Sequence, residues 1–374
     1  MKRIANVTRQ LVKTTGAARN TLEQTRLFHN LGWEVHVFGE FVNKNNIKES
    51  GGIPHKIFTL PLSNYKRRLQ FAKSTGKKLE KGNFDLIFGH GEIFDQDVLF
   101  LHNCVHLANE LVKGRPLPED HPVGQIHKKI LTEQKFKLVV CNSDLMKKDL
   151  AQRYSIPESK LVTIHPGFSP EQFNLNKAEQ LRDQFRSEQN LTDEVLIGLI
   201  TSGNFEKRNV DVFIQACAHL PTDLKNKCKF LVVGKGPDNG WDRKLVNELN
   251  ESDRFIFIEP IPQIEKIYHG VDIQVLPAKW EEFGRVVPEG MTCKNPVIVS
   301  HQVGSSDLLE GESRDLILNP VTAESLTQKL LSLIENEDLR HRIGEINRTT
   351  AAKYSEEEQG KKLKATLLEY GLID

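Results

Sequence analysis

Short apolar segments alternate with longer amphipathic segments along the whole chain. In the first half, apolar runs rich in β-branched residues predict strands at 3–7, 34–39, 56–60, 85–89, 97–101, 137–141 and 161–164. Runs of this kind are typical of strands that are covered on both faces of a sheet. Helical patterns lie between them, for example at 17–31, and Ser143 is expected to cap a helix that runs to about Tyr154.

The same alternation begins again after residues 165–177, a segment without periodicity that contains two prolines and is interpreted as a linker. Beyond it, strands are predicted at 195–201, 229–234, 254–259, 272–277 and 296–300, and the pattern from about Ala323 onward is helical. Alternating strands and helices are typical of parallel sheets with right-handed crossovers. We therefore predict an α/β chain of two doubly wound, Rossmann-like domains that face each other across a cleft.

Length and composition agree with a globular protein of two domains, because 374 residues can bury two cores. The five cysteines are scattered, odd in number and without CxxC spacing, which favours reduced thiols over a disulfide framework or a zinc site. The first residues do not resemble a secretory signal, and no apolar run approaches the ~18 residues of a membrane span. We therefore expect a cytoplasmic protein.

Charge is distributed unevenly between the two halves. Residues 1–172 carry 26 Lys and Arg against 17 Asp and Glu, a net charge of +9, and the remainder carries 25 against 33, a net charge of −8. Either the first half meets an anionic partner, or the opposite charges help the two domains to close. Nucleic acid is a poor candidate partner, because no basic run is interleaved with aromatic residues.

A basic stretch from Lys66 to Lys78 is interpreted as one helix. Its basic face either is solvated or meets an anionic lipid or a phosphorylated glycan. The second alternative predicts peripheral contact with the inner face of a membrane through the first domain.

The segment 278–300 carries the most informative chemistry. After a predicted strand it turns at Gly284 and opens a helix near Arg285. A helix N-terminus presents free N–H groups and a partial positive charge, so it suits a diphosphate, and glycine lets the backbone approach that group. Glu281 and Glu289 flank the turn, where their carboxylates either accept hydrogen bonds from sugar hydroxyls or are simply solvated charges.

The run EEFGRVVPEGM (281–291), followed by PVIV (296–299), resembles the signature of the retaining glycosyltransferases with the GT-B fold. This family includes sucrose synthases, mannosyltransferases and lipopolysaccharide core glucosyltransferases. Segments 14–39, 139–173, 201–216 and 231–237 are similar to other family segments in the same order, so that the resemblance covers nearly the whole chain. Thr15, Asn204 and Lys294 depart from the residues that the family usually has there, which are Gly, Arg and Gly.

The resemblance implies roles for single residues. Glu281 would contact hydroxyls of the transferred sugar, and His102 would donate or accept a hydrogen bond there, with Asn103, His106 and the loop at His90 as rivals. Lys207 and Arg208 would neutralise the diphosphate, since two cations at a helix start are unfavourable unless an anion is present. The expected donor-binding residues are Gly16, Gly203, Asn204, Phe283, Gly284, Arg285, Val286, Val287 and Glu289.

The resemblance also implies an activity and a division of labour. We expect transfer of a hexose from a nucleotide-diphosphate sugar, with a UDP-sugar favoured, to a hydroxyl of a cell-envelope glycan or lipopolysaccharide-type acceptor, with retention and without a metal or other cofactor. Residues 1–170 would bind the acceptor, residues 171–355 the nucleotide sugar, and residues 356–374 would form a helix that packs back on the first domain. A sugar-nucleotide 2-epimerase and a non-catalytic glycan-binding scaffold are the alternatives.

Overall fold

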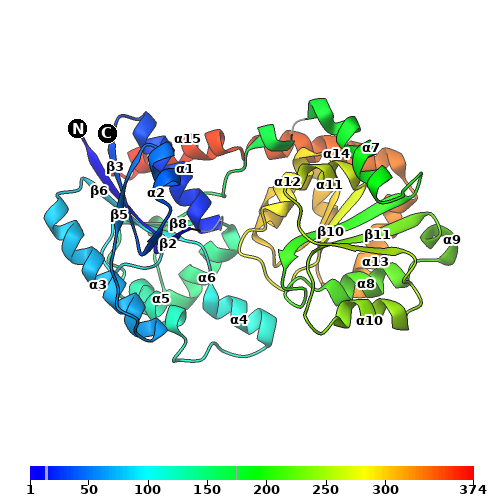
Figure 1. Cartoon of the computed structure of the whole chain (residues 1–374), viewed down its shortest axis with the longest axis horizontal. Coiled ribbons are helices and arrows are strands. Elements are labelled where there is room, and N and C mark those ends of the chain that lie inside the picture. The colour runs from blue at the N-terminus through cyan, green and yellow to red at the C-terminus, as the bar shows by residue number, and fades with distance from the viewer. Residues whose placement is uncertain (13–15, 174) are drawn as a thin grey trace. The chain divides into compact units, whose positions relative to one another are not determined.

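The computed structural model describes residues 1–12, 16–173 and 175–374, which form two compact units (Figure 1). Unit 1 consists of Met1–Gly167 together with Glu356–Asp374, and unit 2 consists of Phe168–Ser355. The chain therefore leaves unit 1, completes unit 2 and returns. The predicted boundary after residue 170 lies three residues from the observed one, and the predicted boundary after residue 355 coincides with it.

Unit 1 contains, among its described residues, a seven-stranded parallel sheet with the order β5-β3-β1-β6-β7-β8-β9. Its strands are β1 (Arg3–Val7), β3 (Glu34–Gly39), β5 (Gly52–Lys56), β6 (Leu86–Gly89), β7 (Val98–Leu101), β8 (Leu138–Cys141) and β9 (Leu161–Thr163). A short second pairing joins β2 (Gln10–Leu11) and β4 (Phe41–Val42). The strand order reverses between β1 and β6, so the topological switch point of unit 1 lies there.

Helices cover both faces of this sheet in unit 1. They are α1 (Gly16–Asn30), α2 (Lys44–Glu49), α3 (Asn64–Gly82), α4 (Val105–Lys113), α5 (Pro122–Glu133), α6 (Asp144–Tyr154), the 3-10 turn η1 (Glu158–Lys160) and α15 (Glu356–Glu369). The C-terminal helix α15, red in Figure 1, lies beside α1. Leu363 and Leu367 of α15 are buried in the same core as Phe28 and Phe88, so the last residues of the chain complete the core of unit 1.

Unit 2 repeats the architecture with a parallel sheet of the order β12-β11-β10-β13-β14-β15. Its strands are β10 (Val195–Gly203), β11 (Cys228–Lys235), β12 (Phe255–Ile258), β13 (Ile273–Leu276), β14 (Val297–Ser300) and β15 (Ile317–Leu318). The chain runs outward from β10 and then restarts at β13 on the other side of β10. The switch point of unit 2 therefore lies between β10 and β13.

The helices of unit 2 enclose one large apolar core with the sheet. They are α7 (Ala178–Glu188), α8 (Val210–Ala218), α9 (Thr222–Lys225), α10 (Trp241–Glu248), α11 (Glu265–Gly270), α12 (Val286–Thr292), α13 (Ala323–Ile334) and α14 (Glu337–Ala352), with 3-10 turns η2 (Pro170–Phe173), η3 (Leu175–Lys177), η4 (Gly304–Leu308) and η5 (Gly311–Leu316). Among the described residues of both units, no helix is long and apolar enough to cross a membrane.

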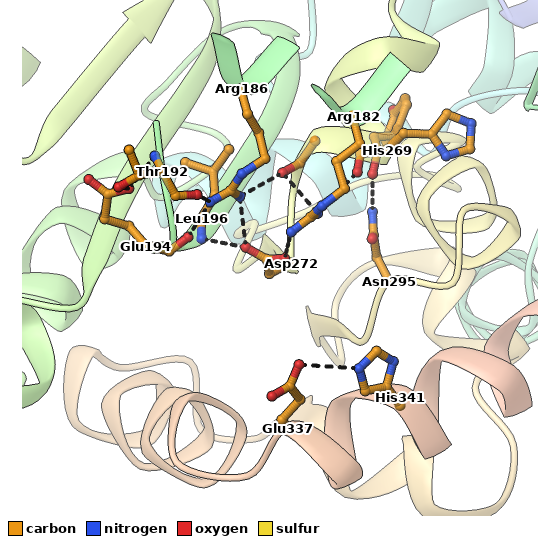
Figure 2. A network of polar contacts seen from close by, with 12 residues as sticks. Arg182, Arg186, Thr192, Glu194, Leu196, His269, Asp272, Asn295, Glu337 and His341 are labelled. Atoms are coloured by element: carbon orange, nitrogen blue, oxygen red, sulfur yellow. Dashed lines mark hydrogen bonds and ion pairs between the residues drawn. The ribbon is translucent and has the colours of Figure 1, made fainter. Parts of the chain in front are cut away.

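A polar network fastens α7 to the amino ends of the strands in unit 2 (Figure 2). Arg182 Nη2 lies 2.6 Å from Asp272 Oδ1, and Arg186 Nη1 lies 3.2 Å from Asp272 Oδ2. The same carboxylate accepts a hydrogen bond from the Leu196 N–H at 2.7 Å. Because Asp272 immediately precedes β13 and Leu196 lies in β10, this network holds the two central strands in register at the edge opposite their carboxyl ends.

Local predictions agree with the structure where the sequence pattern is strong. Ser143 is the N-cap of α6, and its Oγ accepts a hydrogen bond from the Met146 N–H at 3.3 Å. The strand predicted at 56–60 is wrong, because β5 spans Gly52–Lys56. In the predicted run, Phe58 and Leu60 are 75% and 48% exposed, so these apolar residues lie on the surface rather than in the sheet.

Candidate active site

Two loops meet at the switch point of unit 2, and they carry most of the predicted donor site. One loop follows β10 (residues 204–209), and the other follows β13 (residues 277–285). The Lys279 N–H donates to the Lys207 carbonyl at 2.9 Å, and Asn209 Nδ2 donates to the Pro277 carbonyl at 2.9 Å. These hydrogen bonds hold the loop with the predicted basic pair against the loop with the predicted glutamate.

The basic pair forms a compact charge cluster with two glutamates. Arg208 Nη2 lies 2.5 Å from Glu281 Oε2, while Lys207 Nζ lies 3.8 Å from the same oxygen and 3.0 Å from Glu282 Oε2. The four side chains are between 15% and 18% exposed. Burial raises the pKa of Glu281 above its ordinary value, and the attraction of Arg208 and Lys207 only partly opposes that effect. A diphosphate would compete with these carboxylates for the same two cations.

The turn that follows Glu281 is fixed by backbone contacts with residues 302–305. The Glu281 N–H donates to the Gln302 carbonyl at 3.2 Å, and the Ser305 N–H donates to the Phe283 carbonyl at 2.7 Å. Gly284 has a φ of +86°, and a Cβ at this position would lie 3.0 Å from Val303 Cγ1. Both the left-handed backbone and the close approach therefore require glycine at position 284.

Helix α12 begins directly after Arg285, where the sequence predicts a helix start. The Val287 N–H already donates to the Gly284 carbonyl at 3.0 Å, and the Val287 side chain is buried, so this residue has a structural role in the turn. Glu289 Oε2 accepts a hydrogen bond of 2.6 Å from the hydroxyl of Tyr268, a fully buried residue of α11. Tyr268 is not predicted from the sequence, because it lies in a separate helix and belongs to no motif.

A cavity of about 840 Å³ opens beside the loop that follows β10. Gly203, Asn204 and Arg208 line it, together with Lys235 and Trp241, whereas Glu281, Glu289 and residues 283–287 are not among its lining residues. Asn204 has a φ of +55°, and its Oδ1 accepts a hydrogen bond from the Lys207 N–H at 3.2 Å. Asparagine tolerates the left-handed region and forms such turns, which explains its presence here in place of the usual arginine.

The site residues predicted in the first half of the chain lie in unit 1. Gly16 is the first residue of α1, where a Cβ would meet nothing within 4 Å, and the neighbouring Thr15 lies outside the described residues. His102 directly follows β7, and its Nε2 lies 2.6 Å from Nδ1 of His90. The rival His106 lies in α4, where its Nδ1 is 2.9 Å from the Tyr154 hydroxyl.

Within the described residues, side chains of the types that bind metal ions do not cluster. No group of three or more His, Cys, Asp or Glu side chains in this part of the chain could hold a metal ion. The five cysteines are free and buried. Burial raises the pKa of Cys141 to about 12 and that of Cys228 to about 11, so these thiols are protonated at neutral pH.

Comparison with known families decides the classification. The family model described as Glycosyl transferases group 1 matches residues 182–350, and that described as Glycosyltransferase Family 4 matches residues 14–172. Each of the two units is therefore matched by a glycosyltransferase family model. This result confirms the family resemblance, and with the two parallel sheets and the solved structures below it confirms the predicted GT-B fold.

Individual relatives are distant and match part of the chain. The chain is 25% identical to an alpha-D-kanosaminyltransferase of Streptomyces kanamyceticus over 245 residues. This alignment covers 64% of this chain and 62% of that protein. It is 22% identical to the lipopolysaccharide glucosyltransferase WaaG of Escherichia coli over 202 residues. That alignment covers 52% of this chain and 54% of WaaG. The sequence matches therefore span between half and two thirds of these relatives.

Solved structures match along almost the whole chain. The crystal structure of WaaG superimposes with a TM-score of 0.77 at 18% identity, covering 96% of this chain and 98% of that one. The structure of Anabaena Alr3699/HepE in complex with UDP and glucose has a TM-score of 0.77 at 15% identity, covering 99% and 100%. At these identities the likeness shows the fold.

Proposed function

We propose that this glycosyltransferase-family protein transfers a hexose from a nucleotide-diphosphate sugar to an acceptor hydroxyl. The observation that carries the proposal is the cluster of Lys207, Arg208 and Glu281 at the switch point of unit 2. Negative charge develops on the diphosphate as it leaves, and cations already fixed at that point stabilise it without reorganisation. The largely covered carboxylate of Glu281 beside them suits the hydroxyls of the transferred sugar.

The proposed donor is a UDP-sugar, held mainly by unit 2. The likeness to Anabaena Alr3699/HepE, a protein solved in complex with UDP and glucose, supports this choice. Glu289 suits the ribose of any such nucleotide, because a hydrogen bond from the buried Tyr268 holds its carboxylate in place for the two ribose hydroxyls. His102 of unit 1 is proposed to contact a hydroxyl of the transferred sugar.

The proposed reaction retains the anomeric configuration and uses neither an enzymic nucleophile nor a metal. The bond between the anomeric carbon and the diphosphate oxygen breaks, the acceptor oxygen bonds to that carbon, and the leaving phosphate takes the acceptor's proton. Proton NMR of the product would show the same anomeric configuration as the donor. Turnover would be unchanged by EDTA, and inverted product or EDTA-sensitive turnover would contradict these two parts of the proposal.

The proposed acceptor is a cell-envelope glycan or lipopolysaccharide-type molecule that docks on unit 1 of a cytoplasmic protein. The sequence and structural likeness to WaaG, a lipopolysaccharide glucosyltransferase, supports this class. Unit 1 also presents exposed lysines at positions 66, 73 and 77 along one side of α3. Spacings of seven and four residues place them on one helix face, which suits peripheral contact with anionic lipid.

A donor panel tests the proposed function. The purified protein is incubated with UDP-glucose, UDP-galactose, UDP-GlcNAc, GDP-mannose and ADP-glucose, and both melting temperature and nucleotide release are followed. Binding stabilises the folded protein by about 2.7 kcal/mol when the ligand is present at one hundred times its Kd. We expect one donor to stabilise the protein selectively and to release its nucleotide slowly.

Matched variants identify the site that is responsible. Lys207→Ala and Glu281→Ala should abolish nucleotide release, whereas Lys244→Ala, an exposed lysine of α10 in the same unit, should leave it unchanged. Conversion of the donor into another nucleotide sugar without release would instead identify an epimerase. Absence of binding to every nucleotide sugar at millimolar concentration would leave the scaffold function.

A further inference from the structure

A buried histidine of unit 1 has no hydrogen-bond partner within the described part of the chain. His127 lies in α5 and is 5% exposed, and neither of its ring nitrogens forms a hydrogen bond with another described residue. Burial, assisted by the positive charge of Arg68, lowers the pKa of His127 to about 3, so the ring is neutral at physiological pH. A neutral imidazole offers one donor and one acceptor, and leaving both unused in a buried position costs free energy. His127 is therefore a candidate for a contact with a ligand.

The ring of His127 lies against the loop that follows β6, at the carboxyl end of the unit 1 sheet. A Cβ on Gly91 of this loop would be only 3.1 Å from His127 Nε2. The next residue, Glu92, is paired with Arg68 of α3, whose Nη1 lies 3.6 Å from Glu92 Oε1. Because the strand order reverses between β1 and β6, the loop lies at the switch point, where open parallel sheets bind their ligands.

The protein uses the guanidinium group of Arg68 only in part. Its Nε donates to Asn64 Oδ1 at 3.2 Å and its Nη1 approaches Glu92, whereas Nη2 forms no hydrogen bond with any described residue. The Arg68 side chain is 17% exposed, and burial lowers its pKa from the ordinary value. A largely covered guanidinium group with unused donors is stabilised by an anion, which it can bind through two parallel hydrogen bonds.

The charged residues around Arg68 leave an excess of positive charge. Arg9 and Arg67 both pair with Glu40. Glu92 accepts a hydrogen bond from the Arg9 backbone N–H, so the described residues of this cluster bring three guanidinium groups to two carboxylates. Burial raises the pKa of Glu92, and the attraction of Arg68 and Arg9 only partly opposes this effect, which weakens the negative charge beside Arg68. The cluster is therefore short of at least one negative charge.

We propose that Arg68 and His127 form a subsite at the switch point of unit 1 for an anionic group, a phosphate or a carboxylate, of the glycosyl acceptor. The proposal rests on the proposed function, which places the acceptor on unit 1. Arg68 supplies the charge and His127 supplies one N–H. The subsite selects acceptors that carry a negative charge near the hydroxyl that receives the sugar.

Three probes with the same three-carbon skeleton test the subsite and distinguish the two kinds of anion. Glycerol 3-phosphate carries a phosphate, glycerate carries a carboxylate, and glycerol is neutral. Each is titrated at constant ionic strength into histidine-labelled protein, and the imidazole resonances of His127, assigned with His127→Gln, are followed by NMR. We expect a saturable shift with at least one of the two anions and none with glycerol. The anion that binds more tightly identifies the group that the acceptor carries.

The same titrations also report on the charge of the bound probe. An anion close to the imidazole favours its protonated form, so the pKa of His127 should rise above about 3 when the anion is bound. Glycerol should leave this pKa unchanged, because it brings no charge.

Variants locate the bound anion. Arg68→Gln should weaken the binding of the anion about tenfold or more, because it removes a charge-assisted hydrogen bond. Arg26→Gln is the charge-matched control, since it removes the same charge from an exposed arginine of α1 in the same unit, and it should bind as the wild type does. Lys207→Ala removes a cation of the proposed donor site in unit 2 and should leave the His127 response unchanged.

The outcomes separate this inference from the proposed function. No saturable His127 response to either anion at millimolar concentrations, an equal response to glycerol, or equal weakening in Arg26→Gln would overturn the subsite. The wild-type titration is decisive even if Arg68→Gln fails to fold. Because the titration needs no turnover, its failure leaves the transferase function intact, whereas anion binding without release from any nucleotide sugar would contradict the transferase function instead.

Discussion

At the scale of single residues, Glu281 combines a functional position with an energetic cost. Its pKa is raised in the folded protein, chiefly by burial, so the folded state binds a proton more tightly than the unfolded state does. A carboxyl group with a raised folded-state pKa favours folding below its unfolded pKa, and this contribution is lost as the pH rises through the folded-state pKa. The charged form of Glu281 therefore lowers the free energy of unfolding at neutral pH.

Glu281→Gln should consequently be more stable and less active than the wild type. We expect a higher melting temperature at pH 7.5, a difference that shrinks as the pH falls toward 4, and a fall of at least 100-fold in nucleotide release. Thermal denaturation over this pH range and a release assay check both parts. A variant that is less stable at pH 7.5 would show that the ion pair with Arg208 outweighs the cost of burial.

Gly284→Ala should weaken both stability and donor binding. A residue with a side chain is strained at a φ of +86°, and the new Cβ would lie 3.0 Å from Val303 Cγ1, so we expect a loss of about 1–3 kcal/mol in the free energy of unfolding. Gly76→Ala in α3 is the control, because its Cβ would meet nothing within 4 Å and alanine favours a helix by about 0.5–1 kcal/mol. Denaturant unfolding that shows equal stability for both variants would contradict this assignment.

Some residues of the candidate site can be predicted from the sequence, and others cannot. Lys207, Arg208 and Glu281 are found because they lie in recognisable motifs, and their roles in catalysis stay predictions. Tyr268 and Glu282 are not found, because their importance comes from contacts with Glu289 and Lys207 that lie 21 and 75 positions away.

At the scale of secondary-structure elements, α15 belongs to unit 1 although it lies far along the sequence from the other elements of that unit. Leu367 is fully buried in the unit 1 core, whereas the adjacent Leu368 is 44% exposed. Leu367→Ala should lower the free energy of unfolding by about 2–5 kcal/mol, because it leaves a cavity in a packed core. Leu368→Ala should change it by less than about 0.5 kcal/mol. Similar losses for the two variants in urea titrations would show that α15 does not pack as described.

The elements themselves are predicted well where hydrophobic pattern and burial coincide. The strand predicted at 34–39 and the cap at Ser143 match the structure, because a buried strand and an N-cap each have a local signal. β5 has no such signal, since it is the edge strand of its sheet and contains Pro54, which an edge strand tolerates. The more apolar neighbouring run at 56–60 therefore has the stronger strand pattern in the sequence.

At the scale of the whole molecule, the surface of unit 1 predicts association with anionic membranes. Exposed lysines at 66, 73 and 77 lie on α3, and the preceding loop exposes Phe58 and Leu60. Each lysine near an anionic surface contributes about 1 kcal/mol, so replacing all three by glutamine should weaken binding to phosphatidylserine-containing vesicles by up to about 100-fold. Co-flotation at two salt concentrations measures this, and the wild-type binding should weaken as salt rises.

A charge-matched control keeps this prediction specific to unit 1. Replacing Lys227, Lys244 and Lys329 of unit 2 by glutamine removes the same net charge from the other half of the chain. This variant should bind vesicles as the wild type does. Equal weakening by both triple variants would show a dependence on net charge alone, and no vesicle binding by the wild type would exclude the membrane surface.

The sequence by itself determined the architecture and the family of this protein. Strand and helix periodicity, the repeated alternation after residue 165 and the motif at 281–291 are local patterns, and each is legible without knowledge of distant neighbours. The tertiary structure decided which of these residues meet. Arg208 contacts Glu281 across 73 positions, His90 contacts His102, and α15 returns to the core of unit 1. These contacts depend on strand order and on the switch points of the two sheets, because parallel strands bring together loops that no short sequence window contains.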